Sequence, residues 1–183
     1  MSGTGMKLTW AAFDTAIGEC AVAWGDAGIV GAQLPEVDSA ALRRRMQRRF
    51  PGAATGQPEA AIAGVIGAIQ ALLRGEPVPL SGTLLDWRCV PPFNRRVYEV
   101  ALTIPPGRTL TYGEVAQRLG APGAARAVGQ ALGNNPFAPI VPCHRVLAAG
   151  GRMGGFSAPG GVTTKLRMLA IEGARVGDEP SLF

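Results

Sequence analysis

The sequence predicts an α+β protein in which strands come first along the chain and helices dominate the second half. Residues 8–34 contain three short β-forming runs, LTWAAF, ECAVAW and GIVGAQL, separated by turn sequences. From residue 93 onward, apolar residues recur at helical spacing instead. The length of 183 residues and a hydrophobic content of 47% suit one folded domain or two small ones. We place a boundary near Pro91, which gives domains of 1–90 and 91–183.

Two helices are predicted to follow the strands. The first spans about 38–50, with Asp38 or Ser39 as its N-cap, and the second spans about 59–73. The first contains the run RRRMQRR, which could be a DNA-binding arm. Such a run is more often the solvated face of an amphipathic helix, and we favour that interpretation. The proline-rich connector 76–92 is predicted to hold a short strand.

The second half is predicted to begin with a helix over 93–104 and to continue with two short helices. Thr111 and Glu114 have the spacing of a capping box, so the next helix should begin at Tyr112. Another helix should span about 124–132 after a tight Gly/Pro turn. Such a pair is a helix-turn-helix signature, although plain helical hairpins share the pattern.

The helix predicted over 124–132 is unusually slim, because six of its residues and neighbours are Ala or Gly and Arg126 is its single charge. Sequence-specific reading of the major groove needs several polar side chains, so this helix is poorly suited to it. A thin helix can approach a narrow groove and insert one Arg where a base has left the stack. Packing against a neighbouring helix explains the small residues equally well.

Charge is distributed unevenly along the chain. Residues 1–90 hold eight Lys or Arg and eight Asp or Glu, whereas residues 91–183 hold ten and five, so the net charge of +5 lies in the second half. An anionic partner such as nucleic acid would be attracted there, although a mildly basic protein needs no such partner. We find no signal-peptide pattern and no apolar run long enough for a membrane span. Three cysteines are too few for a disulfide framework, and we expect a cytoplasmic protein.

The stretch VPCHRV places Cys143 beside His144, the single histidine of the chain. A thiolate is a good nucleophile, and an imidazole held by a carboxylate can take the thiol proton. Adjacent side chains meet only where the chain turns, and Pro142 favours such a bend. We therefore expect Cys143 to be a nucleophile held ionised beside His144, whereas Cys20 and Cys89 are expected to be buried and packed as small apolar side chains. A zinc site of three Cys and one His has no usual ligand spacing here, and we expect no metal.

PCHRV, preceded by RAVGQALGNNP at 126–136, resembles the signature of the O6-alkylguanine-DNA alkyltransferases. The similarity runs from about Phe93 to Gly173 and more loosely over the N-terminal strands. It implies a ribonuclease-H-like N-terminal α/β domain and a helical C-terminal domain with a helix-turn-helix. It also implies direct repair of O6-alkylguanine, and of O4-alkylthymine, by irreversible transfer of the alkyl group to the protein. No cofactor is expected, since the protein is the acceptor.

The resemblance assigns catalytic roles to four residues. Cys143 would attack the alkyl carbon, and His144 would act as the base, oriented through water by Glu172. Tyr112 would protonate the departing guanine. Arg145 is expected to be structural.

The resemblance also assigns residues that contact DNA or line the substrate pocket. The expected partner is double-stranded DNA, bound in the minor groove by a monomer with little sequence preference, and Arg126 would fill the gap left by the flipped base. The other expected DNA contacts are Tyr112, Asn94, Gly113, Ala121, Ala125, Ala127 and Gly129. The expected pocket residues are Asn135, which would also brace the active-site turn, with Pro142, Val146, Phe156 and Ser157.

Some positions depart from the family pattern. Phe156 stands where Tyr is usual and the loop before Lys165 is about two residues longer, which puts the accepted alkyl size in question. Tyr98 replaces a usual Trp, which we interpret as a packing change.

Features of the sequence oppose three other functions. An alkyltransferase-like binding protein lacks the reactive Cys that stands here at Cys143. A Cys–His hydrolase would need an oxyanion site and a separate His. A helix-turn-helix regulator would need a more polar recognition helix.

Overall fold

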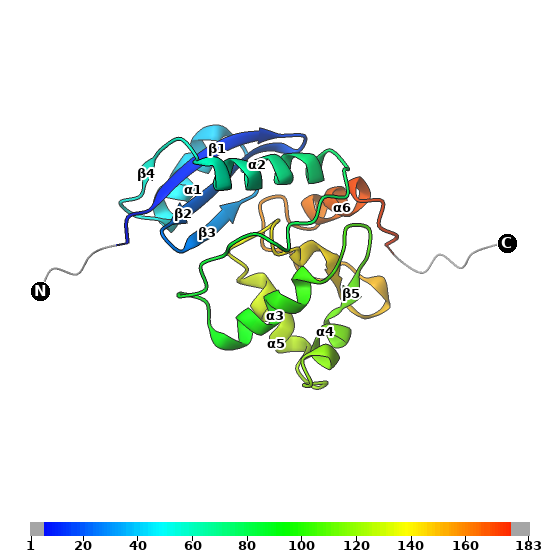
Figure 1. Ribbon diagram of the computed structural model, residues 1–183. Coiled ribbons are helices and arrows are strands. Elements are labelled where there is room, and N and C mark those ends of the chain that lie inside the picture. The colour runs from blue at the N-terminus through cyan, green and yellow to red at the C-terminus, as the bar shows by residue number, and fades with distance from the viewer. Residues whose placement is uncertain (1–5, 177–183) are drawn as a thin grey trace, which may run out of the picture.

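The computed structural model describes residues 6–176. A small sheet flanked by two helices lies above a mainly helical part in Figure 1. Strands β1 (Thr9–Thr15), β2 (Gly18–Gly25) and β3 (Gly28–Gln33) form an antiparallel meander. The two-residue strand β4 (Ala54–Thr55) pairs in parallel with β1, so the sheet order is β3-β2-β1-β4. The three predicted strands are confirmed, and the short β4 was not predicted.

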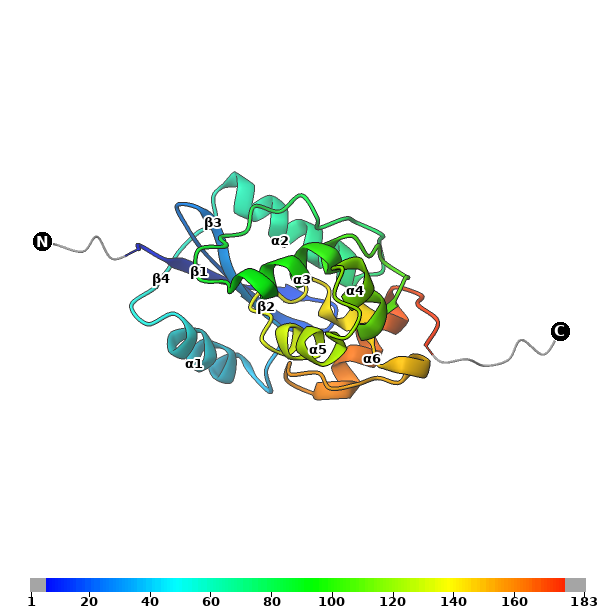
Figure 2. The same cartoon turned by 90° about the horizontal axis from the view of Figure 1, so that it is seen from below.

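Helices α1 (Ser39–Arg49) and α2 (Ala60–Leu73) cover opposite faces of this sheet (Figure 2). Side chains of a strand alternate between its two faces. Trp10, Ala21 and Ala23 therefore pack with Leu42 and Met46 of α1, while the residues between them on β2 face α2. Both helices lie where the sequence predicts them.

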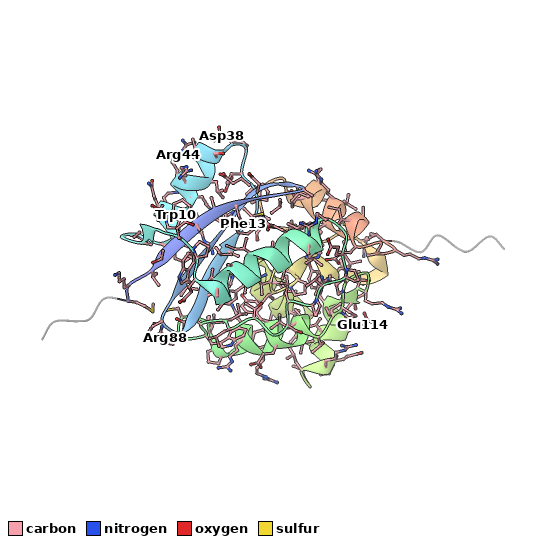
Figure 3. The ribbon with its side chains drawn as sticks, turned by 45° about the horizontal axis from the view of Figure 1, so that its top comes forward. Trp10, Phe13, Asp38, Arg44, Arg88 and Glu114 are labelled. Carbon is pink, nitrogen blue, oxygen red and sulfur yellow. The ribbon has the colours of Figure 1, made fainter. Side chains whose placement is uncertain are left out.

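Most side chains of the basic run in α1 are exposed, which agrees with the favoured interpretation of this run as the solvated face of an amphipathic helix. The carboxylate of Asp38 accepts the N–H of Ala41 and caps the helix, and Figure 3 shows Asp38 and Arg44 on the outer side of α1. Arg49 differs from the rest of the run, because it is half-buried. Its guanidinium donates to the carbonyls of Ala32 and Pro136, at 2.6 and 3.0 Å, and so ties α1 to the second half of the chain.

The second half contains four helices within the described residues. They are α3 (Pro92–Leu102), α4 (Tyr112–Arg118), α5 (Ala125–Gly133) and α6 (Gly161–Ile171). The capping box at the start of α4 is present, with Thr111 accepting the N–H of Glu114 and the Glu114 carboxylate accepting the N–H of Thr111. Strands β5 (Leu110–Thr111) and β6 (Val146–Leu147) form a parallel pair. Helix α6, β5 and β6 were not predicted.

The predicted strand in the connector 76–92 is wrong. The connector makes a single parallel bridge, between Leu85 and Ile29, and forms no regular strand. Four prolines remove backbone donors and limit ladder formation.

The two halves pack against each other through one continuous hydrophobic cluster. It contains Val22 and Ile69 from the first half and Val97, Phe137 and Met168 from the second. The N–H of Ala32 also donates to the carbonyl of Pro136 across this junction, at 2.8 Å. Within residues 6–176 no helix combines the length and the apolar character needed to cross a membrane.

The surroundings of Tyr98 agree with our interpretation that Tyr in place of the usual Trp is a change in packing. Its side chain is buried between α3 and α5, and its hydroxyl donates to the carbonyl of Ala131 at 2.7 Å. Its ring packs edge-on against Phe137. A Tyr thus fixes the position of α5 on α3.

Candidate active site

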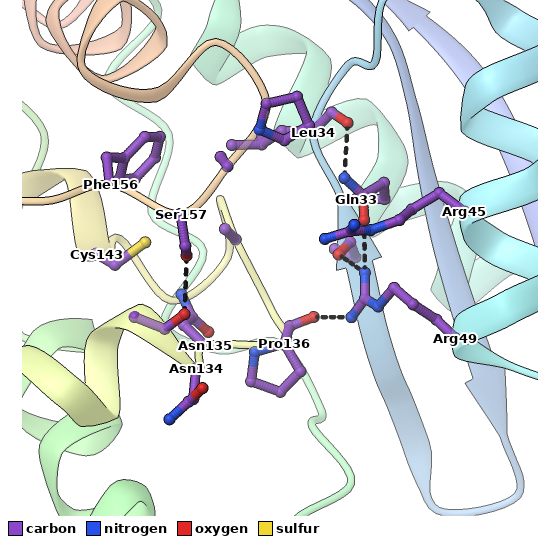
Figure 4. A pocket seen from close by; sticks show the side chains of 15 residues that line it. Gln33, Leu34, Arg45, Arg49, Asn134, Asn135, Pro136, Cys143, Phe156 and Ser157 are labelled. Atoms are coloured by element: carbon purple, nitrogen blue, oxygen red, sulfur yellow. Dashed lines mark hydrogen bonds between the residues drawn. The ribbon is translucent and has the colours of Figure 1, made fainter.

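Cys143 begins a single 3-10 turn, Cys143–Arg145, directly before β6. The turn is held from the preceding loop by Asn135, whose side-chain amide donates to the carbonyl of Val141 at 2.8 Å and accepts the N–H of Phe137 at 2.9 Å. These are the contacts that a brace of this turn requires. Cys143 as a residue is 8% exposed and lines a pocket, toward which its sulfur points from a recessed position (Figure 4).

The expectation that the sulfur is ionised at rest is not met. Burial raises the pKa of the Cys143 thiol above its usual value. A hydrogen bond from Asn135 and the positive charge of Lys165 act in the opposite direction without overcoming burial. At neutral pH the free protein therefore holds Cys143 as a thiol, which must lose its proton as it reacts.

His144 is fully buried and is oriented by Glu172, at the C-terminal end of α6. The ring Nε2 donates directly to Glu172 Oε1 at 2.8 Å, so the expected bridging water is wrong. Burial lowers the pKa of His144, which keeps the imidazole neutral. Because the carboxylate accepts from Nε2–H, the lone pair lies on Nδ1, which is buried and has no hydrogen-bond partner among the described residues. The ring is thus in the tautomer that can act as a base.

Arg145 holds the carboxylate that orients His144. Its guanidinium donates to both oxygens of Glu172, at 2.9 and 2.7 Å, and to the carbonyl of Ile104 at 2.7 Å. Although burial alone raises the pKa of Glu172, the hydrogen bonds from His144 and Arg145 bring it down to about 2. Arg145 therefore has a structural role, in which it fixes the Glu172 carboxylate next to His144.

Lys165 is a residue of the site that sequence reasoning missed. It is 1% exposed, and its ammonium donates to the carbonyls of Val146 and Met153, at 2.7 and 2.8 Å. It therefore ties α6 to β6 and to the loop after it, and its charge lowers the pKa of Cys143. The signal that could have revealed its burial is its spacing, because Lys165 lies three and four residues before the apolar Met168 and Leu169 and so shares their helix face.

Tyr112, the first residue of α4, lies between α5 and the loop after β6. A Cβ placed on Gly154 would lie 2.7 Å from the Tyr112 hydroxyl, whereas one on Gly129 would lie 3.9 Å from its ring. Burial, and then the charge of Cys143, raise the pKa of Tyr112, so its phenol keeps its proton at neutral pH. Glycine at 154 is what allows the phenol to reach this position.

Gly154→Ala should therefore displace the Tyr112 phenol. It also strains the backbone, because Gly154 has a φ of +62°. We expect a roughly tenfold or larger loss in the rate of any reaction in which Tyr112 donates a proton, as removal of general acid catalysis costs about 10²-fold or more. Gly150→Ala is the matched control, because Gly150 also has a positive φ, of +71°, but a Cβ there would meet no atom within 4 Å, so this variant should retain most activity. Equal rates for the two variants would contradict the role of this close approach.

The residues expected to touch DNA lie along α3, α4 and α5, except Ala121, which lies in the turn between α4 and α5. Arg126 is exposed on the first turn of α5, where it can reach outward. The others are half-buried small or polar residues: Asn94, Gly113, Ala121, Ala125, Ala127 and Gly129. Ala125, Ala127 and Gly129 give α5 the slim surface that the sequence predicts.

A pocket of about 280 Å³ lies between the two halves of the chain (Figure 4). It brings together Cys143, Asn135, Phe156 and Ser157, four of the residues expected to share a site. Its other lining residues are Ala32, Gln33, Leu34, Arg45, Arg49, Gly133, Asn134, Pro136, Ala138, Ala158 and Pro159.

Two expected pocket residues lie elsewhere. Val146 is fully buried in the core, and Pro142 lines a different cavity. Ser157 donates to the carbonyl of Gly133 at 2.8 Å, which links the loop to the end of α5. Within residues 6–176, no three His, Cys, Asp or Glu side chains gather closely enough to hold a metal ion.

The chain is similar in sequence to a family of DNA methyltransferases. Residues 92–174 match the family model described as 6-O-methylguanine DNA methyltransferase, DNA binding domain. The methylated-DNA–protein-cysteine methyltransferase of Mycobacterium tuberculosis strain H37Rv is 44% identical over 123 residues, which cover 67% of this chain and 72% of that protein. The protein of the same name from Methanothermobacter thermautotrophicus is 36% identical over 152 residues, covering 83% and 78%.

A solved structure agrees over almost the whole chain. The crystal structure of Mycobacterium tuberculosis OGT in complex with DNA is similar with a TM-score of 0.72 and 35% sequence identity. The similarity covers 93% of this chain and 96% of that one. The two proteins therefore share the mixed α+β fold over both the first and the second half of the chain.

Proposed function

The chain belongs to the methylated-DNA–protein-cysteine methyltransferase family, and from that membership we propose that it repairs DNA by transferring the alkyl group of O6-alkylguanine to Cys143. The observation that carries the assignment of the acceptor is the geometry around Cys143. A recessed thiol lines a pocket and is followed in the chain by a neutral, carboxylate-held imidazole. O4-alkylthymine is proposed as a second substrate.

The reaction is an in-line displacement at the alkyl carbon. The thiol proton passes to Nδ1 of His144, the sulfur bonds to the carbon, and the bond from carbon to O6 breaks with its electron pair left on guanine. The Tyr112 hydroxyl donates a proton to the guanine, and return of the His144 proton to Tyr112 restores both side chains. The thioether is stable, so each protein reacts once.

Cys143 must ionise only when substrate is present. Its raised pKa disfavours a free thiolate, and Lys165, hydrogen-bonded to two carbonyls nearby, supplies a positive charge that stabilises the thiolate as it forms. The buried Glu172 carboxylate offsets the positive charge that His144 acquires.

We further propose the finer organisation of the molecule. Residues 1–90 form a ribonuclease-H-like domain and residues 91–183 the DNA-binding and transfer domain. Helices α4 and α5 form a helix-turn-helix that meets the minor groove of duplex DNA with little sequence preference. The protein acts as a cytoplasmic monomer.

The test of the proposed function is intact-mass measurement after mixing with duplex DNA that contains O6-methylguanine. We expect a gain of one methyl group per protein, located on the peptide that carries Cys143. The DNA should contain guanine in equal amount, and a second addition of substrate should give no further reaction. An unchanged protein mass under reducing conditions would refute the transfer.

Arg126→Ala should weaken repair in duplex DNA more than reaction with free O6-benzylguanine. Extrusion of a base costs a few kcal/mol, and the free base needs none. We expect a roughly tenfold lower rate on duplex DNA and little change on the free base. Arg118→Ala removes the same charge from the exposed end of α4 and is the control. Equal losses on both substrates would rule out filling of the gap by Arg126.

A further inference from the structure

The pocket that contains Cys143 is basic on the side formed by the first half of the chain. Gln33 of β3 and the guanidinium groups of Arg45 and Arg49 from α1 line this wall, opposite Cys143 and Phe156 (Figure 4). None of the fifteen lining residues is acidic. The site therefore joins a nucleophile from one half of the chain to positive charge from the other.

Arg49 is committed to the structure of this wall. It donates to the carbonyls of Ala32 and Pro136 and to the side-chain oxygen of Gln33, at 2.6, 3.0 and 3.0 Å. Burial, and then the charge of Arg45, lower the pKa of Arg49 to about 10, so the two guanidinium groups repel each other. An anion in the pocket would relieve that repulsion.

Arg45 has donors available for such an anion. Its closest carboxylate among the described residues is Glu36, at 3.8 Å, which is longer than a hydrogen bond. Its side chain is 44% exposed, in contrast to that of Arg49. Glu36 does not line the pocket, so a ligand can approach Arg45 from the other side.

The proposed reaction leaves part of the substrate free to enter the pocket that this wall and Cys143 share. In an in-line displacement, the sulfur, the carbon and O6 lie on one line, and the remainder of the alkyl group projects to the side. Tyr112 does not line the pocket, so the phenol that would protonate the guanine lies away from the basic wall. A negative charge on the alkyl group would repel the forming Cys143 thiolate, and nearby guanidinium groups offset that repulsion.

We propose that this pocket selects O6-alkyl groups that end in a carboxylate, with Arg45 as the residue that recognises the carboxylate. The inference rests on the proposed function and names a substrate class within it. Arg45 determines specificity, and Arg49 fixes the wall on which Arg45 stands. A methyl group carries no charge for Arg45 to recognise, so we expect methyl transfer to be independent of Arg45.

The test compares three duplexes that contain O6-methylguanine, O6-carboxymethylguanine or the uncharged O6-carbamoylmethylguanine. Single-turnover rates give the ratio of carboxymethyl to carbamoylmethyl transfer. Arg45→Gln should lower this ratio about fivefold, the equivalent of about 1 kcal/mol for a partly exposed ion pair. Arg45→Lys should keep part of it, and methyl transfer should be unchanged in both variants.

Arg44→Gln is the matched control, because Arg44 is an exposed arginine of the same helix outside the pocket. An unchanged ratio in Arg45→Gln, or an equal fall in Arg44→Gln, would overturn the proposal while methyl transfer still supports the proposed function. Loss of methyl transfer in the wild-type protein would instead refute the proposed function itself.

Discussion

Cys143→Ala should abolish the gain of any alkyl group from methylated DNA. The reaction has no acceptor without this sulfur, so the loss should be complete rather than partial. The side chain is recessed, and alanine keeps most of its packing, so the variant should fold and bind methylated duplex DNA. Intact-mass measurement and a DNA-binding titration on the same samples separate transfer from binding.

Cys89→Ala is the control for this experiment. The expectation that Cys89 is buried is wrong, because Cys89 is exposed whereas Cys20 and Cys143 are buried. Nonspecific alkylation would therefore favour Cys89. Full transfer by Cys89→Ala together with none by Cys143→Ala is the expected pattern. Transfer that persists in Cys143→Ala would show that another residue is the acceptor.

Glu172→Gln should both destabilise the protein and slow the reaction. The change leaves the buried guanidinium of Arg145 without its carboxylate, and breaking a buried pair costs about 3–5 kcal/mol. It also weakens the control of the His144 tautomer. We expect a fall in the free energy of unfolding of about 3 kcal/mol, measured in urea, and a lower transfer rate where the variant is folded.

Glu99→Gln provides the comparison, because Glu99 forms an exposed pair with Arg95 on α3. Exposed pairs contribute little, so its stability should change only slightly. If the two variants unfold at the same urea concentration, the buried cluster does not stabilise the fold.

The same cluster predicts a dependence of stability on pH. Although burial alone raises the pKa of the Glu172 carboxyl, the hydrogen bonds from His144 and Arg145 lower it to about 2 in the folded protein, from the ordinary value of 4.5. A lowered pKa stabilises the folded state above the unfolded value, and this contribution is lost as pH falls from about 4.5 toward 2. The shift corresponds to about 3 kcal/mol. Unfolding curves for wild type and Glu172→Gln should therefore converge as the pH approaches 2.

Local features were predictable because they depend on neighbours in the chain. The capping box of Thr111 and Glu114 lies within one helical turn, and the alternation of side chains in β2 lies within one strand. Helix α6 escaped prediction for a related reason. Its buried face includes Lys165, and a charged residue interrupts the apolar pattern by which a helix is recognised.

The candidate site was predictable in its residue types and less so in its geometry. Cys143, His144 and Glu172 were named, yet the direct bond from His144 to Glu172 replaces the expected bridging water. The protonation state of Cys143 was expected to be thiolate, but burial raises the pKa of the thiol. Burial is a property of the whole fold and cannot be read from the neighbours of a residue in the chain.

By itself, the sequence determined the three strands of the N-terminal meander, the helices α1 to α5, the chemistry of the PCHRV stretch and the family to which the chain belongs. Only the tertiary structure decided that Lys165 lies near the thiol and that Arg45 and Arg49 line the pocket of Cys143. These residues are brought to the sulfur by the packing of α6 and of the first half of the chain. Their contacts join positions far apart in sequence, where neither helical nor strand periodicity specifies which side chains meet.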